Sequence, residues 1–160
     1  MTRNIAYPSA DFPGPPTITV GIPDDWETLT VPGVHLAAAQ PHVDGQFRAN
    51  IVVTVQRFGP DFTDQDARAG LEQRKSSLPG LEELGTGTVD VDGTSWTTSE
   101  YSYTQPGHTT VVQSARYTLV DRGGVAKDIV EIVGSCGAES AGDEAEIVRS
   151  IQDTVTVELA

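Results

Sequence analysis

The chain has a single cysteine, Cys136, among its 160 residues. One cysteine cannot form an intramolecular disulfide, and it cannot build a cysteine-based metal cluster. Cys136 ends a strand-like run, and no conspicuous base stands near it in the sequence. We therefore interpret it as a small buried hydrophobe and not as a reactive thiol.

Long apolar runs are also missing. No stretch approaches the ~20 apolar residues that a membrane-spanning helix needs, and residues 1–16 lack the apolar segment of a signal peptide. From these two absences we expect a cytoplasmic protein.

Basic residues are scarce. Ten Lys and Arg stand against 23 Asp and Glu, which gives a net charge of -13. Nucleic acid and anionic membranes are bound chiefly through Lys and Arg, so we expect neither as a partner. The acidic residues are concentrated in residues 128–160, which contain eight of them and only Arg149 as a base. Such a surface usually serves solubility, and the alternative is recognition of a basic partner.

The motifs of several large enzyme classes are absent. We find no Gly-x-Ser-x-Gly elbow, no P-loop and no glycine-rich dinucleotide fingerprint. The run from Gly85 to Gly87 is too short to hold a phosphate. His35, His42 and Asp44 match no known metal-ligand spacing, and no fourth ligand is evident.

Isolated titratable residues add no catalytic arrangement. The pairs Asp24/Asp25 and Glu82/Glu83 are adjacent in the sequence, so a strand would send the two carboxylates to opposite faces. His108 follows the turn at Pro106 and reads as a solvated loop residue. We therefore predict no catalytic residue, no metal and no cofactor.

The clearest positive signal is the strand at residues 47–58. Alternation places Ala49, Ile51 and Val53 on one face, which predicts a core face. Val52 and Phe58 interrupt the other face, so we expect a central strand that is partly covered on its back.

Two helices are predicted. The first begins at the N-cap Thr63, with Asp66 completing a capping box, and ends before Pro79. Its predicted buried face consists of Ala67, Leu71, Arg74 and Leu78. The second has acidic residues at its N-terminus (Glu139, Asp143 and Glu144) and an apolar stripe of Ile147, Val148, Ile151 and Val155.

The other segments read as strands and turns. We expect a strand at 17–22, Trp26 as a core plug with ligand stacking as the alternative, and a hairpin of 27–31 with 34–40. A meander follows at 81–91, 94–104, 108–120 and 125–133. The predicted organisation is an extended or disordered arm at 1–16 and one α+β domain at 17–160, with an antiparallel sheet of about six strands flanked by helices.

Several of these features resemble a known family. The strand from Arg48 to Val53, the helix end at Leu78-Pro79-Gly80, the Gly93 turn, Gln113 in a long strand and the final amphipathic helix are similar to the LpqN-like actinobacterial lipoproteins and related bacterial domains of unknown function. Those families share the fold of the photosystem II extrinsic protein P (PsbP). The resemblance implies an α/β/α sandwich of PsbP-like fold and carries no catalytic residues over.

Three functions remain open from the sequence. The first is a noncatalytic binding or accessory protein with a protein or peptide partner. This partner would bind either at an apolar concavity beside the sheet or at the acidic C-terminal surface. The second, implied by the resemblance, is a cytosolic chaperone for a secreted effector. The third is a small-molecule enzyme whose site is assembled from distant residues.

Overall fold

The structure, a computed structural model, describes residues 1–159. Its strands are β1 (Thr17–Thr19), β2 (Glu27–Leu29), β3 (Leu36–Ala39), β4 (Asn50–Phe58), β5 (Glu82–Val91), β6 (Thr94–Thr104), β7 (Thr110–Asp121), β8 (Lys127–Gly137) and β9 (Thr156–Glu158). Its helices are α1 (Asp64–Ser76), α2 (Ala141–Gln152) and the short 3₁₀-helix η1 (Ala138–Ser140). The predicted α+β class is confirmed.

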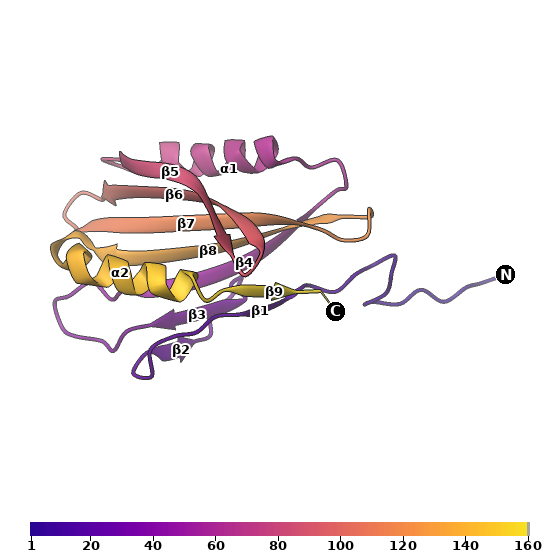
Figure 1. Cartoon of the computed structure of the whole chain (residues 1–160), viewed down its shortest axis with the longest axis horizontal. Helices are drawn as coiled ribbons and strands as arrows, with labels where there is room; N and C mark the ends of the chain where they lie inside the picture. Colours follow the sequence, from indigo (N-terminus) through magenta and orange to yellow (C-terminus); the bar gives the residue numbers. More distant parts are fainter. Residues whose placement is uncertain (160) are drawn as a thin grey trace.

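The main sheet has seven antiparallel strands in the order β2-β3-β4-β8-β7-β6-β5 (Figure 1). The expectation of about six strands was one short for this sheet. β4 is an interior strand, but β8 and not β4 lies in the middle of the order. The reason is the return of the meander: β8 pairs with β7 along its whole length on one side and with β4 from Lys127 to Ser135 on the other.

The two faces of this sheet carry separate cores. Ile51 and Val53 of β4 are fully buried on the face that packs against α2, as the alternation predicted. Their neighbours there include Trp26 and Trp96. The opposite face packs Tyr101 and other side chains against α1. Trp26 is therefore a core plug, as predicted.

α1 begins where the sequence indicated. The Thr63 hydroxyl accepts a hydrogen bond from the Asp66 backbone N–H at 3.2 Å, and the Asp66 carboxylate accepts one from the Thr63 N–H at 2.9 Å. Both halves of the capping box are thus present. Ala67 and Leu71 are buried as predicted, but Arg74 is not: its side chain is 60% exposed and Lys75 takes the buried position instead.

α2 packs directly on β8 at a glycine. A Cβ atom built on Gly134 would lie 2.0 Å from Cγ1 of Val148. Val148 and Ile151 are buried as predicted, whereas Ile147 is exposed and Gln152 is fully buried. The buried face of α2 therefore includes Gln152 and not Ile147, so the predicted face was correct at Val148 and Ile151 and wrong at Ile147. Val155 is buried, but it lies beyond the end of α2 and not within the helix.

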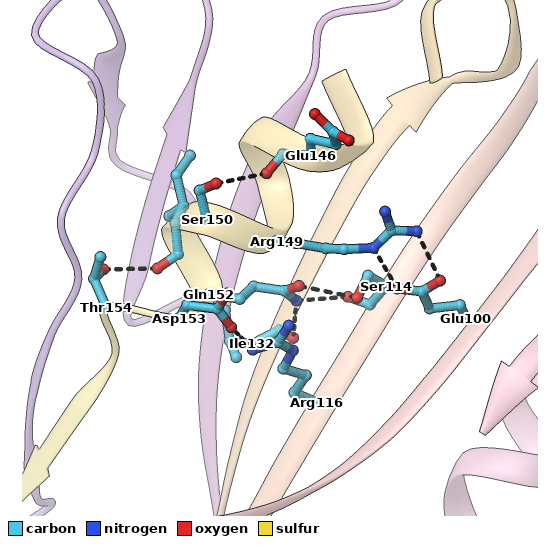
Figure 2. Close-up of polar contacts among 11 residues, drawn as sticks. Glu100, Ser114, Arg116, Ile132, Glu146, Arg149, Ser150, Gln152, Asp153 and Thr154 are labelled. Carbon is cyan, nitrogen blue, oxygen red and sulfur yellow. Dashed lines mark hydrogen bonds and ion pairs between the residues drawn. The ribbon is translucent and has the colours of Figure 1, made fainter. Parts of the chain in front are cut away.

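Polar contacts fix the C-terminal half of α2 to the sheet (Figure 2). The Gln152 amide donates to the backbone carbonyls of Ser114 and Ile132, at 2.8 and 3.2 Å, and accepts from the Ser114 hydroxyl at 2.9 Å. Arg149 forms two hydrogen bonds to Glu100, at 2.8 and 2.9 Å. The buried amide of Gln152 thus has partners for both its nitrogen and its oxygen.

The short strand β9 was not predicted. It pairs with β1 in a two-stranded antiparallel sheet, with Ile18 opposite Val157. β1 is also shorter than the expected strand at 17–22, and β8 runs to Gly137, beyond the expected end at 133. Three-residue strands carry too little alternation to be recognised without their partner.

Residues 1–16 contain neither helix nor strand. Arg57 at the end of β4 holds this arm, because its guanidinium donates to the backbone carbonyls of Pro13 and Gly14. The same guanidinium donates to the buried Asp128 at 2.7 and 2.8 Å.

Candidate functional site

A groove runs along α1 where the helix leaves the face of β4 uncovered. α1 forms one wall through Ala67, Gly70 and Leu71. Strands β4, β8 and β7 form the floor. The remaining lining residues are Thr54, Gln56, Phe58, Phe62, Asp66, Arg74, Tyr117, Ile129 and Glu131. We call these twelve residues the α1 groove.

Two aromatic rings close one end of the α1 groove. Phe58 ends β4 and Phe62 lies in the loop before α1, and their rings stack with centroids 4.0 Å apart and an angle of 15° between planes. Both rings are only half-buried. They therefore present apolar surface that a bound group could cover.

The charged side chains that line the α1 groove are paired within the protein. Arg74 donates to the two carboxylate oxygens of Glu131 at 3.0 and 2.6 Å, and this pairing raises the pKa of the guanidinium. Asp66 is engaged in the helix cap, whose backbone hydrogen bond lowers the pKa of its carboxyl. A carboxyl with a lowered pKa is ionised at neutral pH, so Asp66 does not act as a general acid there.

Tyr117 is the remaining titratable residue of the groove. Its hydroxyl donates to the Asp64 carboxylate at 3.1 Å, and burial of the ring raises its pKa above the ordinary value. It stays protonated at neutral pH. The hydroxyl can accept a hydrogen bond from a bound group, but it cannot serve as a base.

The volume of the α1 groove is about 200 Å³. Sites for whole small molecules and cofactors usually measure about 300–1,000 Å³. The groove is therefore matched to one or two side chains of a larger partner.

Lys75 of α1 is not part of the groove lining, but it ties the helix to β5 and β6. It is fully buried between α1 and the sheet, where its ammonium donates to Glu72, Glu83 and Ser99 at 3.0, 2.9 and 2.9 Å. It also lies 5.3 Å from the ring centroid of Tyr101, and burial raises the pKa of that phenol to about 12. The sequence signal was present, since Lys75 follows Ala67 and Leu71 at helical spacing, but a lysine at such a position is usually placed in solvent.

The residues weighed as metal ligands are not brought together. His42 contacts Asp44 at 3.0 Å on the exposed surface, while Nδ1 of His35 accepts a hydrogen bond from the Val55 N–H at 3.2 Å. Among residues 1–159, no three His, Cys, Asp or Glu side chains are arranged to hold a metal ion.

Cys136 lies in β8 and is 2% exposed, within the core under α2. Burial raises the pKa of its thiol, which disfavours the reactive thiolate. His108 is exposed in the β6–β7 turn, beside an open hollow that Tyr103 and Phe47 also line. Glu83 pairs with Lys75, and Asp24 and Asp25 are exposed. The structure joins none of these residues into a common site.

None of the helices in the described part of the chain has both the length and the apolarity that crossing a membrane requires.

Comparison with known proteins finds similarity in structure only. No family model matches the sequence, and no curated protein matches it. LpqN of Mycobacterium tuberculosis, described as involved in cell envelope biogenesis, superposes with a TM-score of 0.72 at 19% identity, over 91% of this chain and 86% of LpqN.

Two further solved structures share the arrangement. PsbP of the cyanobacterium Synechocystis matches with a TM-score of 0.60 at 15% identity, over 98% of each chain. A protein of unknown function from Pseudomonas aeruginosa matches with a TM-score of 0.58 at 15% identity, over 88% of this chain and 96% of its own. At such identities the likeness concerns the fold. The chain therefore has an LpqN-like, PsbP-like fold, as the resemblance in its sequence implied.

Proposed function

We propose that the chain is a noncatalytic binding or accessory protein that takes an apolar anchor side chain of a protein partner in the α1 groove. The observation that carries the proposal is the chemical state of this groove. Its walls are apolar and aromatic, and its charged groups, Asp66, Arg74 and Glu131, are already paired. Catalysis would instead require convergent groups with pKa values near the working pH.

The paired charges also define how a partner is recognised. The apolar lining of Phe58, Phe62, Leu71 and Ile129 offers area but no net charge. Binding here should therefore depend little on salt, because screening weakens exposed charge contacts and leaves apolar contacts in place. The acidic surface of α2 would behave in the opposite way.

Gly70 provides a direct test. It lies on the groove wall, and a Cβ atom at this position would meet nothing within 4 Å. Gly70→Phe should therefore fill the groove without disturbing the core, and phenylalanine is more favourable than glycine inside a helix by about 0.5 kcal/mol. The matched control is Gly142→Phe on α2, where the space is also open.

The measurement is quantitative affinity capture with wild type and both variants at low and high salt, followed by binding assays on each purified partner. We expect partners that survive high salt, are lost with Gly70→Phe and are retained with Gly142→Phe. Partners that bind Gly70→Phe as well as wild type would exclude the α1 groove. Turnover of a small molecule that Gly70→Phe abolishes would show an enzyme instead.

A further inference from the structure

The two edges of the main sheet differ in length. β2 at one edge has three residues, whereas β5 at the other has ten. Within residues 1–159, β6 is the one strand that pairs with β5 (Figure 1). In an antiparallel pair, every second residue of an edge strand directs its N–H and C=O groups outward. β5 therefore presents a row of backbone donors and acceptors.

Nothing in the described chain occupies the outer side of β5. No backbone hydrogen bond other than those of the β5–β6 ladder involves residues 82–91. The side chain nearest from α1, Lys75, contacts the Glu83 carboxylate and not the backbone. Residues 82–88 are all exposed, including Leu84, whose exposure is 54%.

The edge also lacks most of the features that protect exposed strands. Proteins commonly protect such edges with charged side chains, lysine above all, with proline, a bulge, a short strand or a covering loop. Of these, β5 has carboxylates and a bulge. β5 contains no proline and no lysine, and its only irregularity is a bulge between Glu83 and Gly85. From Gly85 to Thr88 the side chains are small, so a second backbone can approach closely.

The charge of β5 decides between two possible binding partners, a second copy of this chain and a basic segment of another protein. From Glu82 to Asp92 there are four carboxylates, and the chain has no lysine or arginine from Ser76 to Ala115. A second copy that paired along the same edge would bring its own Glu82, Asp90 and Asp92 alongside those of the first, whereas Glu83 is already paired with Lys75. Like charges placed directly opposite destabilise a sheet. A second copy is therefore disfavoured, and a basic strand is favoured.

We propose that β5 is a docking edge for an extended, lysine- or arginine-bearing segment of another protein, which adds to the sheet as an eighth strand. Backbone hydrogen bonds would supply affinity, and Glu82 and Asp90 would select basic side chains. Leu84 would be covered by an apolar side chain of the added segment. This edge is separate from the α1 groove and does not depend on it.

The test uses the whole chain and a synthetic ten-residue peptide of alternating valine and threonine with two lysines at each end. We expect saturable binding by calorimetry, with amide shifts in NMR spectra concentrated in β5 and β6. The same peptide methylated on alternate backbone nitrogens keeps its charge but cannot complete a ladder. It should lose binding, and so should a peptide with glutamates at its ends.

Charge reversal locates the contact. The Glu82 side chain is exposed and forms no hydrogen bond or ion pair with residues 1–159. Glu82→Lys should therefore weaken binding of the lysine peptide about threefold or more while the fold is kept. Glu139→Lys, an equal charge change in η1, is the matched control and should have a smaller effect. Analytical ultracentrifugation of the chain without peptide should show no dimer whose population differs between wild type and Glu82→Lys.

Three results would overturn the proposal. One is equal binding of the methylated peptide, which would mean attraction by charge alone. Another is equal weakening by Glu82→Lys and Glu139→Lys. The third is a dimer formed through β5, which would make a second copy the occupant.

Discussion

A single carboxylate, Asp128, ties three parts of the molecule together. It is fully buried in β8 and accepts hydrogen bonds from Arg57 and, at 3.0 Å, from Arg122. Burial acts to raise the pKa of this carboxyl, but the two arginines outweigh it and hold the pKa below the ordinary value. A carboxyl with a lowered pKa in the folded state stabilises the fold above its unfolded pKa, and this stabilisation is lost as pH falls.

We expect Asp128→Asn to cost about 3–5 kcal/mol at pH 7, because Arg122 would stay buried without a counter-charge. The variant should also lose less stability than wild type on acidification from pH 5 to below about pH 4. Urea unfolding across this range checks both expectations, with the exposed Asp61→Asn as control. An acid-induced loss equal to that of wild type would show that Asp128 is not the group responsible.

At the scale of elements, the distance between α2 and β8 depends on a missing side chain. A Cβ at Gly134 would come within 2.0 Å of Val148 and 3.0 Å of Ile51. Gly134→Ala should therefore force α2 outward and destabilise the fold by about 1–3 kcal/mol in denaturant titration. The double variant Gly134→Ala/Val148→Ala should lose less stability than the sum of the losses of the two single variants, because the smaller side chain at 148 makes room for the added methyl group. Simple additivity would mean that the helix does not pack there as described.

The elements show which signals a sequence carries and which it does not. The capping box of α1 and the alternation around Ile51 are local, so they predicted the helix start and the buried face of β4 correctly. The burial of Lys75 and Gln152 depends on partners in other strands. A period of 3.6 residues fits neighbouring stripes almost equally well, and only those partners decide which one is buried.

The α1 groove illustrates the same limit. An apolar concavity beside the sheet was one of two binding modes expected, but its lining combines β4, β7, β8 and α1. The position of Gly70 on its wall follows from how α1 crosses the sheet, and no local pattern encodes that crossing. The free edge at β5 likewise follows from the strand order and not from the strand's own sequence.

At the scale of the whole molecule, the middle strand β8 pairs with one strand that is near in the sequence, β7, and with one that is distant, β4. β4 pairs with β8 across sequence separations of 69 to 85 residues (127 − 58 and 135 − 50), whereas β5 to β8 form hairpins between consecutive strands. Closing the longer loop costs more entropy. We expect the transition state for folding to contain the β5–β8 meander, with β4 joining afterwards.

Ala115→Gly in β7 should then slow refolding, and Ile51→Ala in β4 should mainly accelerate unfolding, as stopped-flow kinetics would measure. Until β4 arrives, the edge of β8 is open, so the folding protein would pass through a stage in which a strand that is largely buried in the native fold is available to other chains.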